Sequence, residues 1–262
     1  MRATVVRRTA LAASVVSLAL LATACGGSDG GSKDDGGKAP AGKDGAANTA
    51  VKALTSAELE KASLEKGDVP GHQVSAAGPE DIAQPEDIVV DKTECKPIGY
   101  ALYGAKRGTP VATTGRKVVQ EPKKEGVKDA KDAKAALEAG LDVTSTLVAL
   151  SSYEGDGAEK SLAELREAAT ACAAAGFSVA VKDSPQTITK VTEEEVSGGD
   201  EAVAWTVTIE EEGMKIPFKI VSVRQGGTVA TFSSFNLGSM AGADIEFGLP
   251  SEVIAAQVKK LG

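Results

Sequence analysis

Apolar and polar residues alternate through much of the second half of the chain, which predicts β-strands. A period of two begins at Phe177 and returns over residues 203–209. Gly226-Gly227 then precedes another apolar segment, and a glycine pair in that position is typical of a tight hairpin turn. The pattern predicts an antiparallel β-meander with one buried face. Trp205 is expected on that face, together with Val203, Val207 and Ile209.

Apolar residues at three- and four-residue steps predict helices at both ends of this meander. Ser161 and Glu164 match a capping box that begins one helix, and Gly176 suits its end. Cys172 falls on the apolar stripe of that helix, so its side chain is expected to be buried. A last helix is expected over 251–261.

The first part of the globular region adds shorter elements. Thr55 and Glu58 form another capping box, so a helix is expected to begin there and to end near Gly67. A short helix over 97–104, a helical or disordered stretch over 128–140 and a strand over 146–153 complete the prediction. Helices packed around a meander sheet give an α+β fold, with residues 51–262 as a single domain.

Residues 1–24 have the three parts of a bacterial signal peptide: arginines without acids, an apolar run, and small residues before Cys25. The segment resembles the lipobox of bacterial lipoproteins, whose cysteine carries diacylglycerol and becomes the mature N-terminus. It departs from the usual lipobox at Ala22, where leucine is common. A retained membrane span is the alternative, although it needs about 20 apolar residues. Arg7-Arg8 also fits a twin-arginine export signal loosely.

Residues 25–50 follow as a flexible linker behind the lipidated cysteine. They consist largely of Gly, Ser, Lys, Asp, Ala and Pro without apolar periodicity, and such a segment buries too little surface to offset its ordering entropy. Residues 26–30 spell a hydrolase nucleophile pattern, and residues 37–43 spell most of a phosphate-binding loop. Both motifs need a strand before and a helix after them, so both matches are coincidences of composition.

The negative net charge of the chain limits the classes of partner that it is expected to bind. The 262 residues carry a formal net charge of −8, with 25% charged and 42% hydrophobic residues. Nucleic-acid binding needs a basic face, so no nucleic-acid partner is expected. Adsorption to anionic lipid headgroups is disfavoured for the same reason. The lipid anchor is therefore the expected attachment, on the extracytoplasmic face of the cell membrane.

Cys95 and Cys172 remain as a pair once Cys25 is assigned to lipid. Disulfides persist outside the cytoplasm, so a bridge between the two is predicted. The alternatives are two free buried thiols, or zinc ligands together with His72. Zinc prefers about four ligands at tight spacing, whereas these three are scattered.

No catalytic, cofactor-binding or metal-binding residue is predicted. His72 is the one histidine, and a histidine base also needs a nucleophile and an orienting acid. The acidic runs 193–195 and 210–212 each supply carboxylates that glycoside hydrolysis would need, but strand ends and turns are commonly acidic. The acidic repeat over 79–88 matches no calcium loop and is interpreted as a solvated loop.

Thr93-Glu94-Cys95 leads to Tyr103-Gly104, and Cys172 follows late in an alanine-rich helix before the closing meander. This arrangement, over roughly residues 51–262, resembles the PknH-like extracellular sensor domain of actinobacterial receptor kinases and free-standing lipoproteins. The resemblance implies an antiparallel sheet packed with helices around a cleft for an unidentified ligand. Such domains often have two disulfides, whereas this chain can form one. A signalling role would need a separate signalling protein as partner.

Three functions compete on this basis. The leading hypothesis is a lipid-anchored, non-catalytic ligand-binding or sensor domain for an unidentified small molecule or lipid. The alternative is a lipid or glycolipid carrier, which predicts an apolar cavity between the sheet and a helix. An extracytoplasmic hydrolase is third, because its motifs are missing from the sequence.

Overall fold

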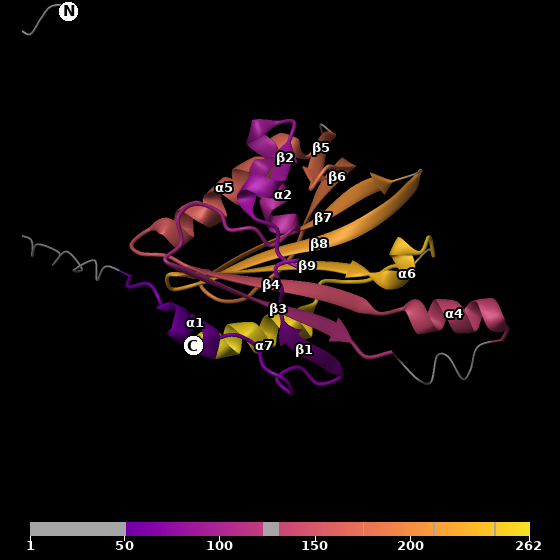
Figure 1. The fold of residues 1–262 in the computed structure, drawn as a ribbon, viewed down its shortest axis with the longest axis horizontal. Helices are drawn as coiled ribbons and strands as arrows, with labels where there is room; N and C mark the ends of the chain where they lie inside the picture. Colours follow the sequence, from indigo (N-terminus) through magenta and orange to yellow (C-terminus); the bar gives the residue numbers. More distant parts are fainter. Residues whose placement is uncertain (1–50, 123–130, 175, 212, 244) are drawn as a thin grey trace, which may run out of the picture. The chain divides into compact units, whose positions relative to one another are not determined.

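The computed structural model describes residues 51–122, 131–174, 176–211, 213–243 and 245–262. Within these ranges one antiparallel sheet of nine strands is packed with six α-helices, which confirms the α+β prediction (Figure 1). The strands are β1 (His72–Ala76), β2 (Ile88–Val90), β3 (Ala112–Gln120), β4 (Thr144–Ser152), β5 (Phe177–Val181), β6 (Ser184–Glu194), β7 (Glu201–Glu211), β8 (Met214–Gln225) and β9 (Thr228–Asn236). The helices are α1 (Ser56–Lys61), α2 (Lys96–Leu102), α4 (Ala133–Leu141), α5 (Gly157–Cys172), α6 (Leu237–Met240) and α7 (Ser251–Leu261), with 3-10 turns η1 (Pro85–Asp87) and η2 (Thr93–Cys95).

Strands β5 to β9 lie side by side in chain order, so the predicted meander is confirmed. The hairpin between β8 and β9 turns at Gly226-Gly227, as its sequence indicates. The sheet is wider than the meander, because β4, β3 and β1 continue it beyond β9 and β2 joins it beside β5.

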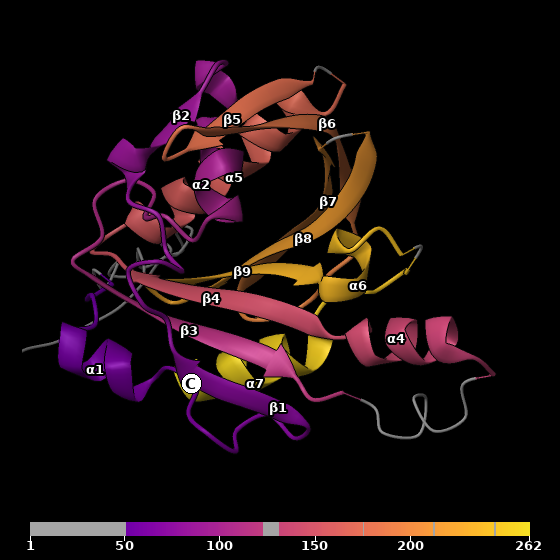
Figure 2. The same ribbon diagram turned by 45° about the vertical axis from the view of Figure 1, so that its right-hand side comes forward.

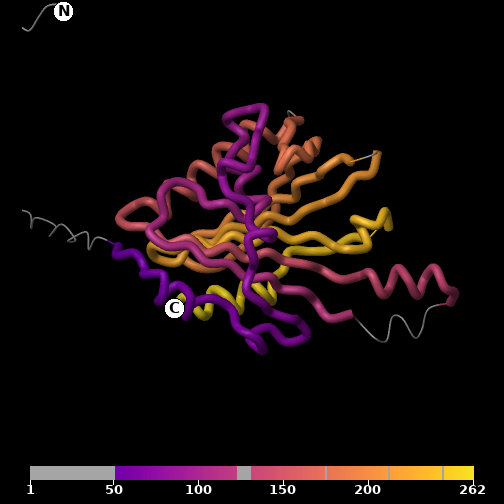
Figure 3. Tube along the Cα trace, in the orientation of Figure 1, coloured from indigo at the N-terminus to yellow at the C-terminus, as the bar shows by residue number. Residues whose placement is uncertain are grey.

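Consecutive strands β1 and β2 occupy opposite edges of this sheet. The chain between them therefore crosses the strands, as the Cα trace shows (Figure 3). Ala77 donates to the carbonyl of Gly115 at 3.1 Å, and a Cβ at Gly115 would collide with Ile82. Glycine at this position of β3 thus lets the crossing segment lie directly on the sheet.

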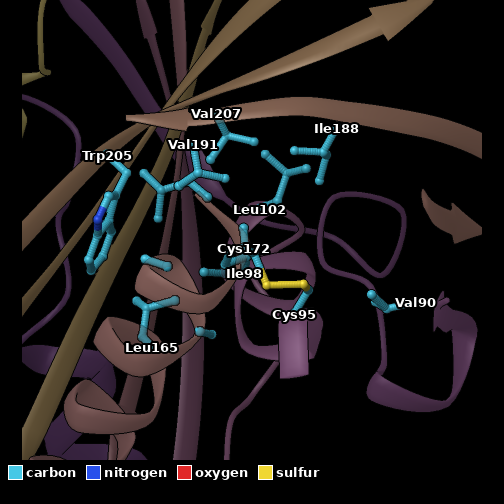
Figure 4. Packing of buried hydrophobic residues seen from close by; sticks show 14 of the residues in the cluster. Val90, Cys95, Ile98, Leu102, Leu165, Cys172, Ile188, Val191, Trp205 and Val207 are labelled. Carbon is cyan, nitrogen blue, oxygen red and sulfur yellow. A yellow bond between two sulfur atoms is a disulfide. The ribbon is translucent and has the colours of Figure 1, made fainter. Parts of the chain in front are cut away.

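We call the face under α2 and α5 the inner face. Helix α2 contacts both β2 and β9, which lie five strands apart, so the sheet curls around these helices (Figure 2). Trp205, only 5% exposed, packs there with Val191, Val207 and Leu165 (Figure 4). Trp205 is thus buried with Val203, Val207 and Ile209, as predicted. Cys95 and Cys172, the predicted pair, form a disulfide across this core with a Cα–Cα distance of 6.0 Å.

We call the opposite face, which carries α1 and α7, the outer face. Val148, Val221 and Phe232 point to this side and are fully buried in a second core with Ile254 of α7. The prediction of one buried face was therefore wrong. The central strands are apolar at successive positions because helices cover both of their faces.

Gln257 of α7 links the outer helices through hydrogen bonds in a fully buried position. Its side chain accepts from the Leu64 amide at 3.2 Å and donates to the Ala62 carbonyl at 2.7 Å. These bonds satisfy backbone groups just after α1, which ends at Lys61 rather than near Gly67 as expected. The capping box of Thr55 and Glu58 is present as predicted.

The start of α5 differs from its prediction. The helix begins at Gly157, four residues before the expected capping box, so Ser161 lies inside the helix and is buried. Gly157 packs against the Tyr153 side chain, and the Tyr153 hydroxyl lies 3.4 Å from Ser161 Oγ. Ser161 is thus a buried hydrogen-bonding residue rather than a cap, and the helix ends at Cys172, before Gly176.

Candidate functional site

A groove with a volume of about 1310 Å³ lies where β6 and β7 meet α7. It is the largest of the cavities described here; the others measure about 400 to 480 Å³. Its walls are the end of β6, the loop 195–200, the start of β7, residue 249, α7 and Arg166 of α5. It exists because α7, at 11 residues, packs on β8 and β9, whereas the 16-residue α5 on the inner face reaches β6 as well.

The floor of the groove is apolar. It consists of Ile254 from the outer core and of four half-buried residues that pack against that core: Val196, Ala202, Leu249 and Val258. Apolar residues at the base of a groove favour the binding of an apolar or amphipathic group by burial of its surface.

The rim of the groove is charged. Glu193 and Glu195 are exposed and make no ion pair with any residue in the described ranges. Lys259 of α7 is exposed on the opposite wall, and Arg166 Nη1 lies 2.9 Å from Glu201 Oε1. The groove therefore presents two carboxylates that have no ion-pair partner in the described part of the chain.

Glu194 is held differently from its neighbours. Lys219 Nζ lies 2.5 Å from Glu194 Oε1 and 2.7 Å from Thr206 Oγ1, and Thr206 also donates to this carboxylate. Burial alone would raise the pKa of Glu194, but the bonds from Lys219 and Thr206 outweigh it and lower the pKa. Glu194 is thus an ionised, anchored side chain that fixes the end of β6 against β7 and β8.

The loop that closes one end of the groove is fixed by Arg224. Its Nη1 lies 3.2 Å from Asp200 Oδ2, and its Nε lies 3.5 Å from Glu201 Oε2. Gly199 adopts a φ of +57°, and a Cβ there would collide with the Arg224 carbonyl. Glycine at this position lets the loop turn tightly against β8, which gives the groove a defined wall.

The groove wraps around the edge of the sheet. By the strand register, Glu193 lies opposite Trp205 on the inner face, whereas Glu194 lies opposite Ala204 on the outer face. Both glutamates line the groove, together with Arg166 from the inner side and Val258 from the outer side. A cavity that draws on both faces of a sheet lies at its margin, and here it lies at the end of the β6–β7 hairpin.

The polar groups that line the groove bear on the hydrolase alternative. The groove contains the hydroxyls of Ser197 and Ser251 but no histidine or cysteine. A general acid for glycoside hydrolysis needs a raised pKa, whereas the pKa of Glu194 is lowered. In the described part of the chain, no group of three or more His, Cys, Asp or Glu side chains is placed to hold a metal ion.

His72 and Asp81, which the sequence also singles out, lie apart from the groove. His72 begins β1 instead of lying in a loop, and its Nδ1 is 2.9 Å from the Pro70 carbonyl. Asp81, in the acidic repeat, accepts from Lys117 Nζ at 2.8 Å. Cys25 and Glu212 fall outside the described residues.

Two further observations bear on the alternatives. Between the sheet and α5, side chains including Leu162, Leu165 and Trp205 form a packed cluster, whereas the groove beside α7 is a cavity of the kind that the carrier hypothesis predicts. Helices in the described ranges are all too short or too polar to cross a membrane.

The groove itself was not predicted, although the sequence singled out the acidic run 193–195. Its floor combines residues 196 and 202 with residues 249–258, and no spacing rule connects these segments. The break after Glu195, Val196-Ser197-Gly198-Gly199, was the one local signal that a loop leaves the sheet there.

The described residues thus form an α+β domain built on one curled antiparallel sheet, with a charged-rim groove at its edge. The structure is similar to the extracellular domain of PknH from Mycobacterium tuberculosis, with a TM-score of 0.47 and 11% sequence identity over 80% of this chain and 98% of that chain. This is the domain to which the sequence was compared above. An uncharacterised Rv0999 ortholog from Mycobacterium smegmatis is a more distant match, with a TM-score of 0.33 and 10% identity over 78% of this chain and 92% of that chain. No protein-family model and no curated protein matches the sequence.

Proposed function

We propose that this protein is a lipid-anchored, non-catalytic binding domain on the extracytoplasmic face of the cell membrane. Its ligand would lie in the groove between β6, β7 and α7. The observation that carries the proposal is the groove itself: about 1310 Å³, with an apolar floor, a charged rim and no histidine or cysteine among its lining residues. A large concave site with a few polar groups around an apolar floor is the usual form of a ligand site.

The anchor rests on the sequence of the first 25 residues. An n-region of arginines, an apolar run and small residues before Cys25 together match a lipoprotein signal. Cys25→Ser should abolish palmitate incorporation, because the thiol that accepts the lipid is removed. Labelling of the variant at the wild-type level would contradict the anchor.

The groove can be tested by filling it. Ala255 is exposed on α7 and lines the groove, whereas Ala163 is exposed on α5 outside it. Ala255→Trp should occupy the groove, and Ala163→Trp is the matched control, because both replace an exposed helical alanine by the same side chain.

Native mass spectrometry of protein purified from its own host measures the effect. Wild type and Ala163→Trp should retain an additional mass that Ala255→Trp lacks. Retention by both variants would place the ligand elsewhere. A wild-type protein that retains no mass would also count against the proposal.

A further inference from the structure

Strand β6 is longer than its outer neighbour, which leaves part of its edge unpaired. Strand β5 pairs with β6 only from Ser184 to Ile188, whereas β7 pairs with β6 as far as Glu194. Among the described residues, no segment pairs with the outer edge of β6 after Ile188. Thr192 and Glu193 point to opposite faces and are both exposed, whereas the side chain of Val191 is buried in the inner core, so the stretch is open on either side from residue 192 onwards.

The register identifies which backbone groups are free. The β8–β9 hairpin closes on the pair Gln225–Thr228 around two residues, and such a closing pair exchanges both hydrogen bonds. Successive residues in a strand point their N–H and C=O groups alternately to the two neighbouring strands. When this alternation is followed from the closing pair along β8 and across to β7, the backbone groups of Trp205 point to β8, and those of its neighbours on β7 point to β6. The N–H and C=O groups of Val191 and Glu193 therefore point away from β7, towards the open edge.

We infer that this edge binds an extended basic peptide segment as an added strand, and this inference rests on the proposed function of the groove. Val191 and Glu193 would supply main-chain hydrogen bonds, as in other cases of strand addition. The peptide would enter the groove, because Glu193, Glu194 and Glu195 all line it. Side chains that alternate along the peptide would meet the inner and the outer side in turn.

Two carboxylates at the end of β6 favour a basic partner there, although Lys190 of β6 and Lys259 across the groove are exposed as well. Glu193 and Glu195 lie two residues apart and have no ion-pair partner among the described side chains. Lysine or arginine at alternate positions of an added strand would face them at the same spacing. The formal net charge of −8 adds a long-range attraction for basic partners and repels acidic ones.

The probe is an acetylated, amidated octapeptide of alternating lysine and threonine. Trp205 is the one tryptophan of the chain and lies directly opposite Glu193, so its fluorescence reports on the edge. Saturable binding that weakens with salt is expected. The matching glutamate–threonine peptide should not bind.

Two substitutions at one residue separate charge from backbone. Glu193→Thr removes the carboxylate and keeps the outward N–H, so it should weaken binding by less than about tenfold, as expected for one exposed ion pair. Glu193→Pro also removes the outward N–H and leaves the ladder to β7 intact, since proline is tolerated on a strand edge. It should weaken binding at least about tenfold beyond Glu193→Thr, because main-chain bonds are lost as well.

A second measurement uses the wild type, so its result does not depend on whether the proline variant folds. The peptide should slow hydrogen exchange at the amides of Val191 and Glu193. Equal binding by Glu193→Pro and Glu193→Thr, unchanged exchange at these amides, or no saturable binding by the wild type would each overturn strand addition. The groove-filling test with Ala255→Trp can still succeed in that case, so failure of this inference is distinguishable from failure of the proposed function.

Discussion

On the inner face, α5 spans β6 to β9, and the disulfide ties its last residue, Cys172, to Cys95 ahead of α2. On the outer face, α7 packs on β8 and β9, and Gln257 connects it to the segment after α1 by hydrogen bonds. The inner core is therefore covalently linked and extends under the whole meander. The outer core is held by non-covalent contacts and stops short of β6.

This difference explains where a binding site can form. A sheet covered along its full width on both faces has no room for a ligand except at its ends. Here the shorter cover on the outer face leaves the β6 edge and the floor around Val258 accessible. The two cores and the groove are formed largely by different residues, so substitutions can separate their effects.

The largest effect is expected from the covalent link of the inner face. Replacing both Cys95 and Cys172 by alanine should lower the free energy of unfolding by about 4–5 kcal/mol in the chain-entropy model, given the sequence separation of 77. Urea unfolding of residues 51–262 measures the loss. A change below about 1 kcal/mol would mean that the bridge does not constrain the unfolded chain.

The two cores are compared directly by truncating one large side chain in each. Trp205→Ala on the inner face and Phe232→Ala on the outer face should each cost about 3–5 kcal/mol, because both side chains are buried. Denaturant melts of the two variants check this. A cost below about 1 kcal/mol for Phe232→Ala alone would restore the one-faced sheet that the sequence pattern predicted.

A smaller loss of stability is expected from removing the hydrogen bonds by which α7 holds the segment after α1. Gln257→Met keeps the volume but leaves the Leu64 amide and the Ala62 carbonyl without their partner. The loss should be about 1–3 kcal/mol. Thermal unfolding beside the exposed control Ala255→Ser measures it. Equal stability of both variants would show that these bonds do not hold α7.

The smallest effect concerns Glu194 and depends on pH. Because the folded state lowers the pKa of this carboxyl, its contribution is present above the unfolded pKa and is lost as pH falls through the folded pKa. Glu194→Gln should reduce stability by less than about 1 kcal/mol at neutral pH and have no destabilising effect in acid. Melts at both pH values test the sign. A loss that grows on acidification would contradict it.

The sequence predicted those structural features that depend on a pattern within a few neighbouring residues. The alternation around Trp205, the glycine pair at 226–227 and the capping box at Thr55 each act within a few residues, and all three are present. Strand β3 was missed because it combines Gly115 and Arg116 with threonines, so its alternation is weak. Arg116 is buried there because it donates to the Leu64 carbonyl and pairs with Glu60, contacts that only the fold creates.

Features of the site depended on contacts between distant segments. The groove joins residues 193–203 to residues 249–259, and its open edge arises from the different lengths of β5 and β6. Arg107 is a similar case: it is buried at 5% exposure and hydrogen-bonds to Thr231 at 3.1 Å, yet no local pattern marks it as an interior residue. Burial of a charged side chain follows from tertiary packing, so sequence spacing could not predict it.

Residue-resolved amide hydrogen exchange on residues 51–262 measures whether the outer edge of β6 is open. The amides of Thr192 and Glu194 bond to β7, whereas those of Val191 and Glu193 point outward by the register. Exchange at Val191 and Glu193 should therefore be at least about tenfold faster than at Thr192 and Glu194. Equal protection of all four amides would show that another segment already covers the edge and that no strand can be added there.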